Sequence, residues 1–166
     1  MDRKLLLLGL LRMQEMHGYQ LNNYLDAFLA FCLDVKKPTA YYLLNKMHED
    51  GWIAVEEQQE GNRPVRRIYS LTPEGEQAYQ NLLRENLGSY APVQFDSDIG
   101  LAFMDSLPES ERNLLLAQRR AQLAQKLTEI EAVPEHPGNF QWMIEHQIRH
   151  LRAELAWLDE IITRFA

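Results

Sequence analysis

The sequence predicts a mainly helical protein: a small α+β head followed by an arm of long helices. Three observations predict this. The first half shows helical periodicity that gives way to alternating, strand-like segments. The last segment carries an apolar stripe at heptad-like spacing, and a stretch containing glycine, serine and proline separates the two parts.

The head is predicted to begin with three helices. Lys4–Met16 is dominated by leucine and methionine, which favours a core helix that stops before Gly18. Tyr19–Leu33 repeats apolar residues at three-and-four spacing, as one face of an amphipathic helix does. A third helix is expected from Pro38, because proline fits the first helical turn, to Gly51.

A two-stranded hairpin is predicted after the third helix. Trp52–Glu56 and Val65–Leu71 have strand character, and Gly61–Pro64 between them is typical of a turn. Three helices followed by a hairpin is the element order of a winged helix-turn-helix domain. A fourth helix should then start at Thr72, a suitable N-cap followed by proline, and run to about Asn86.

The domain junction is expected in Gly88–Asp98, which has little periodicity. We therefore expect a winged helix-turn-helix domain over residues 1–87 and a helical dimerisation domain over residues 88–166. The first long helix of the arm begins at Pro108 and is interrupted at Pro134. Its expected apolar face is Leu114, Leu115, Leu123, Leu127 and Ile130.

The last helix has the sharpest pattern in the chain. Its apolar residues, spaced by threes and fours, are Phe140, Ile144, Ile148, Leu151, Leu155, Leu158, Ile162 and Phe165. Such a stripe must be buried, and the arm supplies only one other long helix. We therefore expect a homodimer. The predicted dimerisation residues are Ile144, Ile148, Leu151, Leu155, Leu158 and Ile162.

Composition limits the classes of protein that fit. The chain has 166 residues, 46% hydrophobic and 25% charged, which is ordinary for a folded domain. The apolar run Leu5–Leu11 is far shorter than the about 20 residues of a membrane span, so we expect a cytoplasmic protein with no membrane partner. Cys32 lies among apolar residues and is interpreted as core packing.

Charge at first argues against nucleic acid, since the net charge is −7. The acidic excess lies mainly in the second half, however, and the head gathers its basic residues in two clusters. These clusters are Lys36, Lys37 and Lys46, and Arg63, Arg66 and Arg67. Contact with DNA phosphates is expected there.

Several segments together resemble the PadR family of bacterial transcriptional regulators, over essentially the whole chain. They are Leu7–Leu11, His17–Tyr19, the pattern from Tyr41 through Leu44 and Met47 to Gly51–Ile53, Arg67–Gly75, and Glu154–Leu158. The resemblance implies a homodimeric repressor that binds a pseudo-palindromic operator in double-stranded DNA. It also implies release by a small aromatic or amphipathic effector or by stress.

In a helix-turn-helix the second helix enters the major groove with its N-terminal part. The predicted DNA-reading residues are Lys37, Thr39, Tyr42, Asn45 and Lys46. Asn45 suits adenine, Lys46 suits guanine or phosphate, and Thr39 suits phosphate or a thymine methyl. The alternative is that these residues form only a solvated helix face. Tyr41 is expected in the core with Leu44 and Met47.

The hairpin arginines Arg63, Arg66 and Arg67 are predicted to reach phosphates or the minor groove. Neighbouring strand residues face opposite sides, so Arg66 and Arg67 cannot both point at one groove. One of them could instead pair with Glu56 or Glu57 across the hairpin. We expect DNA contact from Arg63 and one other.

Phe103, Met104, Trp142 and Trp157 are candidate walls of an effector pocket, with plain packing as the alternative. His146, His150 and Glu154 stand one helical turn apart, but no zinc motif surrounds them, and no cofactor or catalytic motif is present. We expect a DNA-binding regulator and not an enzyme. A winged-helix interaction scaffold, or a ligand sensor without DNA binding, is the alternative.

Overall fold

The computed structural model describes residues 3–17, 20–21, 23–24, 37–59, 66–93, 95–96 and 98–165. It separates into two compact units, Met1–Ala91 and Pro92–Ala166, which we call the head and the arm. Cys32, Arg63 and most of the expected helix Tyr19–Leu33 lie outside the described residues. In the described part of the chain, no helix is long and apolar enough to cross a membrane.

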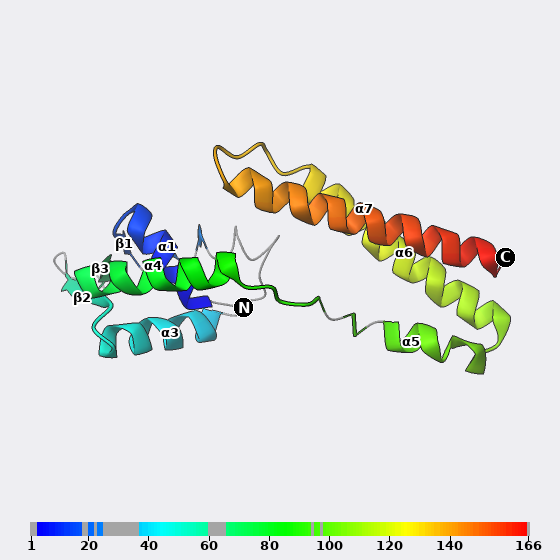
Figure 1. The fold of residues 1–166 in the computed structure, drawn as a ribbon, viewed down its shortest axis with the longest axis horizontal. Helices are drawn as coiled ribbons and strands as arrows, with labels where there is room; N and C mark the ends of the chain where they lie inside the picture. The colour runs from blue at the N-terminus through cyan, green and yellow to red at the C-terminus, as the bar shows by residue number, and fades with distance from the viewer. Residues whose placement is uncertain are drawn as a thin grey trace. The chain divides into compact units, whose positions relative to one another are not determined.

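The head contains helices on a small antiparallel sheet (Figure 1). Its elements are α1 (Arg3–Met13), β1 (Met16–His17), α3 (Lys37–Glu49), β2 (Ile53–Gln58), β3 (Arg66–Leu71) and α4 (Pro73–Gly88). The strand order is β1-β3-β2. Helices followed by a hairpin and a further helix confirm the predicted fold class, a winged helix-turn-helix head before a helical arm. We call the β2–β3 hairpin the wing.

The first predicted helix was too long. Helix α1 ends at Met13, and Met16 and His17 instead form a third strand that pairs with Tyr69 and Ile68 of β3. Met16 is fully buried, so its apolar side chain serves the core from a strand and not from a helix. Two residues are too few to show a periodicity of two, which is why the pattern did not reveal this strand.

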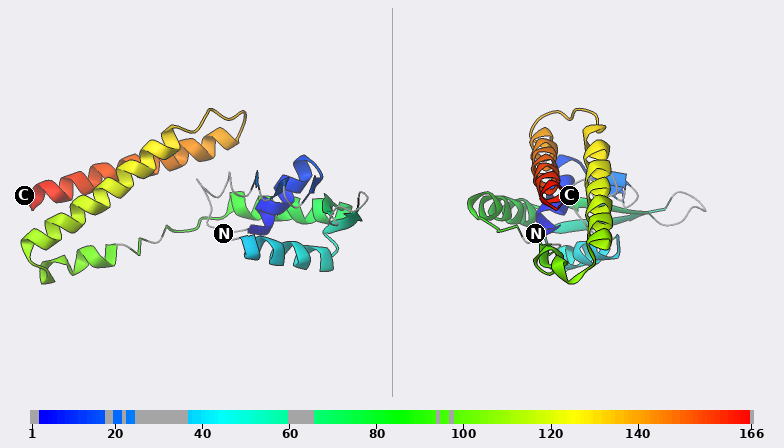
Figure 2. Two further views of the ribbon diagram at one scale, coloured as in Figure 1. Left: turned by 180° about the vertical axis from the view of Figure 1, so that it is seen from behind. Right: turned by 90° about the vertical axis from the view of Figure 1, so that its right-hand side faces the viewer.

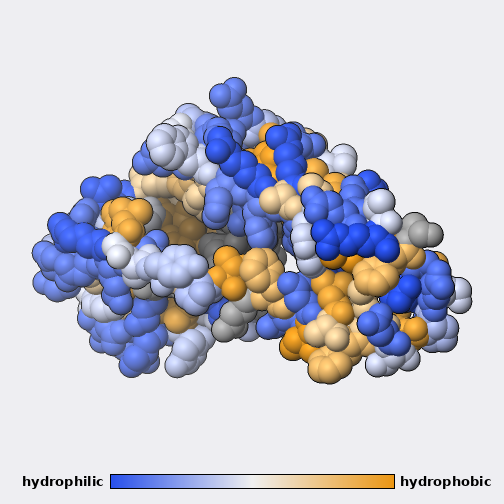
Figure 3. All heavy atoms as spheres, turned by 45° about the vertical axis from the view of Figure 1, so that its right-hand side comes forward, coloured by the Kyte–Doolittle hydropathy of each residue, from blue (hydrophilic) through white to orange (hydrophobic). Residues whose placement is uncertain are grey.

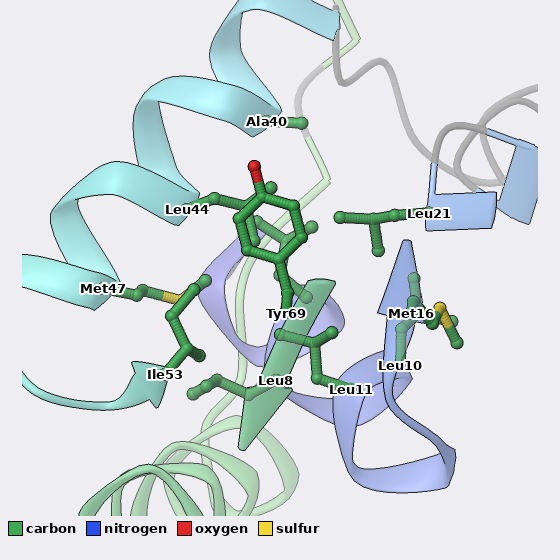
Figure 4. Packing of buried hydrophobic residues seen from close by; sticks show 11 residues of the cluster. Leu8, Leu10, Leu11, Met16, Leu21, Ala40, Leu44, Met47, Ile53 and Tyr69 are labelled. Atoms are coloured by element: carbon green, nitrogen blue, oxygen red, sulfur yellow. The ribbon is translucent and has the colours of Figure 1, made fainter. Parts of the chain in front are cut away.

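The head core forms where α1, α3 and the sheet meet (Figure 4). Its buried residues are Leu7, Leu8, Leu10, Leu11, Met16, Leu21, Ala40, Leu44, Met47, Ile53 and Tyr69. Tyr69 projects from β3 toward α3, with its hydroxyl on the side of Ala40. One face of α3 is therefore fixed against the sheet by apolar burial.

Helix α3 ends in a Schellman motif. The amide of Trp52 donates to the carbonyl of Met47 over 2.8 Å, and the amide of Gly51 donates to that of His48 over 3.0 Å. Gly51 has φ +74°, a conformation that glycine adopts without steric cost. The predicted stop at Gly51 is thus the turn that redirects the chain from α3 into the wing.

The start of α4 packs directly on that turn. Thr72 caps α4 by accepting from the amide of Gly75 at 3.0 Å, and its hydroxyl donates to the carbonyl of Gly51 at 2.7 Å. The amide of Thr72 donates to the carbonyl of Trp52 at 3.1 Å. A Cβ on Gly75 would lie 1.9 Å from the Trp52 carbonyl oxygen, so only glycine fits there.

The arm is mainly a pair of antiparallel helices (Figures 1 and 2). Short helices α5 (Asp98–Ala102) and η1 (Met104–Ser106) precede α6 (Glu109–Glu131) and α7 (Phe140–Arg164). The two long helices begin and end close to the predicted positions, and Pro134 lies in the connection between them. They pack against each other within one chain, whereas the stripe of the last helix was predicted to be buried by a second chain. Ion pairs join them, including Arg152–Glu131 at 2.6 Å.

The packed face of α6 differs from the prediction at its first turns. Leu116 is buried, whereas Leu114 and Leu115 are exposed. The residue seven positions before Leu123 is Leu116, so two helical turns bring it onto the face that Ile130 shares. In a run of three leucines, only the position in phase with the later residues reaches the partner helix.

Replacing Gly75 by alanine is expected to destabilise the head by about 3 kcal/mol, because the new methyl group overlaps a backbone carbonyl that cannot move alone. Gly88→Ala, at the other end of the same helix, meets nothing within 4 Å. It should change the free energy of unfolding by no more than about 0.5 kcal/mol. Chemical denaturation of both variants measures the difference, and equal stabilities would contradict the packing described.

Candidate nucleic-acid interface

Helix α3 presents a polar face opposite its buried one. Tyr42 is 67% exposed, and Asn45 and Lys46 are exposed beside it, one turn further along the helix. Thr39 is half-buried at the start of the helix. Four of the predicted reading residues therefore have described side chains on an anchored helix. The fifth, Lys37, opens α3, but its side chain lies outside those described.

Tyr41 was expected in the core, and this was wrong. Its side chain is 37% exposed, while Ala40, Leu44 and Met47 form the buried stripe. Positions 40, 44 and 47 repeat at four and three, and Tyr41 lies about 100° around the helix from Ala40. The spacing of three that links Tyr41 to Leu44 and Met47 suggested burial, but the buried stripe runs through Ala40 instead.

Lys46 lies between two carboxylates. Its ammonium is 3.4 Å from Oε2 of Glu49 and 3.8 Å from Oδ1 of Asp50. The hydrogen bond to Glu49, with the negative charge of Asp50, raises the pKa of Lys46. Asp50 is also 3.5 Å from the ammonium of Lys4. The Lys46 ammonium, which is predicted to reach DNA, therefore already has two carboxylates beside it.

The wing separates its two described arginines onto opposite faces. Glu57 pairs with Arg67 in the strand register, and Gln58 pairs with Arg66. Arg67 Nε donates to Glu57 Oε1 at 3.2 Å, which is the cross-strand pairing that the sequence left open. Arg66 is exposed on the other face.

Arg67 lies on the same face of β3 as Tyr69, whose ring packs toward helix α3 (Figure 4). Residues 67 and 69 share one face of β3, and the phenol of Tyr69 is buried there. Burial raises the pKa of Tyr69, the positive charge of Arg67 partly offsets this rise, and Tyr41 adds to it. The guanidinium of Arg67 is therefore electrostatically coupled to the side of the sheet that α3 covers.

The arm contains a cavity of about 280 Å³ within the α5–α7 region. Its lining is Phe95, Asp98, Arg119, His150, Ala153, Glu154 and Trp157. Arg119 donates to Asp98 at 3.1 Å and to Glu154 at 3.2 Å, and its guanidinium lies 6.0 Å from the centre of the Trp157 ring. The site therefore combines two aromatic walls with a guanidinium held in place by two carboxylates.

Of the four predicted effector-pocket residues, Trp157 lines this cavity. Phe103 is 70% exposed and Trp142 is 75% exposed, and Met104 is half-buried in η1. The cavity is lined by none of these three. Sequence reasoning did not select Arg119 or Asp98, since a single arginine within a helix is indistinguishable from a solvated surface residue. The described residues contain no group suited to a metal ion.

The predicted dimerisation residues divide into two sets. Ile144, Leu151 and Leu158 are buried by packing within the arm of one chain. Ile148, Leu155 and Ile162 remain half-buried. The surface also carries exposed apolar side chains, drawn in orange in Figure 3. By exposed fraction, the exposed large apolar side chains of the arm include Phe95, Ile99, Phe103, Leu114, Leu115, Trp142 and Met143.

The head is thus a winged helix-turn-helix domain with an exposed α3. Residues 7–81 match the model of the transcriptional regulator PadR-like family. The negative transcriptional regulator PadR of Bacillus subtilis is 24% identical over 128 residues, covering 77% of this chain and 70% of that protein. The winged-helix segment of this chain is therefore similar to the PadR-like family, a family of transcriptional regulators and not of enzymes.

Solved structures share the fold over nearly the whole chain. Bacillus subtilis PadR in complex with operator DNA has a TM-score of 0.82 at 21% identity and covers 98% of both chains. The same protein in complex with p-coumaric acid has a TM-score of 0.78 at 20% identity, covering 98% of this chain and 97% of that one. The Vibrio cholerae virulence activator AphA has a TM-score of 0.74 at 17% identity, covering 97% of this chain and 96% of that one.

Proposed function

We propose that this chain is a dimeric regulator that binds operator DNA through α3 and the wing. The observation that carries the proposal is the anchored helix α3, whose polar face of Tyr42, Asn45 and Lys46 is exposed. A related protein of the same fold was solved with operator DNA. In this reading Asn45 and Tyr42 contact base edges, and Lys46, Thr39 and Lys37 contact bases or phosphates.

The regulator would work in the cytoplasm on a pseudo-palindromic operator. A dimer places its two α3 helices about one DNA turn apart, roughly 34 Å, and a twofold protein matches a twofold site. We propose repression as the outcome, in line with the negative regulator of Bacillus subtilis. Arg63 and Arg67 would add phosphate or minor-groove contacts from the wing.

The dimer would be formed by the arm. Packing within one chain uses Ile144, Leu151 and Leu158, but it leaves Ile148, Leu155 and Ile162 half-buried along α7. Together with the exposed apolar side chains of the arm, they offer a second copy apolar area to bury.

A small effector would bind the arm cavity. Phe95 and Trp157 can enclose an aromatic ring, and Arg119 and His150 can donate to a carboxylate. An aromatic acid suits this lining, and Bacillus subtilis PadR was solved with p-coumaric acid.

Lys46→Ala should weaken binding to a DNA duplex taken from upstream of the protein's own gene. Loss of one phosphate contact should make the slope of log affinity against log salt shallower by about 1. Mobility-shift titrations at several salt concentrations measure this, with Lys126→Ala on the arm as the control. Native protein that binds no such duplex would favour an interaction scaffold or a ligand sensor.

Leu155→Asp should convert the protein to monomers, because a carboxylate would have to be buried in the apolar contact between two copies. The matched control is Ala156→Asp, one position along the same helix at an exposed site, which should remain dimeric. Sedimentation equilibrium at micromolar concentration distinguishes twice 19.4 kDa from 19.4 kDa. A native protein that sediments as a monomer refutes the dimer.

p-Coumaric acid should quench the tryptophan fluorescence of the native protein, since Trp157 lies in the cavity wall. Trp157→Phe should lose most of this change, whereas Trp142→Phe, whose side chain is exposed outside the cavity, should keep it. Fluorescence titrations of the three proteins provide the comparison. Quenching that survives in Trp157→Phe would place the ligand elsewhere.

A further inference from the structure

The ion pair between Glu57 and Arg67 is open to solvent. Arg67 Nε and Glu57 Oε1 are 3.2 Å apart, and the two side chains are 56% and 58% exposed. Such a pair contributes little to folding, because water screens it and two long side chains must be ordered to form it. An incoming phosphate can therefore reach the guanidinium without opening the head.

The pair lies on the α3 side of the wing. Arg67 and Glu57 are register partners on the face of the sheet that holds Tyr69 and Val55. The positive charge of Arg67 lowers the pKa of the buried Tyr69 phenol, whereas Tyr41, near the start of α3, raises it. A duplex seated on α3 and the wing would thus meet Arg67 together with its carboxylate.

The geometry points to Glu57 as a positioning residue that reduces binding to DNA of arbitrary sequence. The bond from Arg67 Nε uses one of the five N–H donors of the guanidinium and fixes the plane of the others. The Glu57 carboxylate also neutralises part of the Arg67 charge that a loosely seated phosphate would otherwise meet. Contact is favourable only where the duplex is seated so that the remaining donors meet a phosphate.

The partly neutralised charge of Arg67 affects how well the protein distinguishes its operator from other DNA. Binding without sequence preference depends almost entirely on phosphate charge. A fixed negative charge beside an interface cation penalises loosely seated complexes, whereas base contacts on α3 compensate in the correctly seated one. The inference rests on the proposed DNA binding and adds a specificity role for an acidic residue.

The test is a double-mutant cycle on Glu57 and Arg67. Affinities are measured by fluorescence anisotropy for a random-sequence duplex of about 30 base pairs and for the upstream duplex, across salt concentrations. Glu57→Gln should tighten binding to the random duplex about two- to fivefold, and binding to the upstream duplex by less. Its salt slope should steepen by up to about 1.

Three variants separate this role from a general effect of charge. In the Arg67→Ala background, Glu57→Gln should produce no gain, because the carboxylate acts through the arginine. Glu57→Asp should behave like the native protein. Glu85→Gln, an exposed position on α4, changes the net charge equally and should leave the ratio of the two affinities unchanged.

The outcomes are distinguishable. If the native protein binds neither duplex, the proposed function fails and this inference with it. If the native protein binds but Glu57→Gln leaves random-duplex affinity unchanged or weaker, only the role of Glu57 is overturned. A gain that persists without Arg67 also overturns it. Thermal unfolding of each variant confirms that the head remains folded.

Discussion

The contact between the Gly51–Trp52 turn and the first turn of α4 is the constraint on which the head depends. Thr72 hydrogen-bonds to both residues of that turn, and Gly75 lets the two backbones approach more closely than any side chain would allow. This joint fixes where α3 ends, where β2 begins and where β3 leads into α4. The angle between α3 and the wing therefore depends on Gly51, Gly75 and Thr72.

Local chemistry explains why much of this could be predicted from the sequence. Thr72–Pro73 and Gly51 are terminal signals that act through neighbouring backbone groups, so their structural meaning does not depend on the rest of the fold. The strand at Met16 and the burial of Ala40 in place of Tyr41 could not be predicted in the same way. Both depend on which surface lies opposite, and that is decided by packing between distant segments.

The candidate site likewise has some features that local sequence predicts and others that depend on packing between distant segments. Exposure of Tyr42, Asn45 and Lys46 followed from helical phase. The sequence left Glu56 and Glu57 as equal candidates for pairing with a wing arginine, and the strand register decides between them, because only Glu57 lies opposite Arg67. The arm cavity was beyond sequence reasoning for another reason: Asp98, Arg119 and Glu154 come from three separate helices, and nothing in their local sequence shows that they meet.

Acidic residues lie beside the cations that we propose as DNA contacts, and they contribute to the net charge of −7. Lys46 has Glu49 and Asp50 as neighbours, and Arg67 has Glu57. In the proposed complex, cations partly neutralised in this way would attract distant DNA weakly, so long-range charge would supply a smaller share of the binding free energy. More of it must then come from short-range contacts, which require that the duplex fit α3 and the wing. The proposed regulator would bind DNA less through charge and more through the fit of the duplex to α3 and the wing. Such a fit requires that the joint between α3 and the wing be rigid.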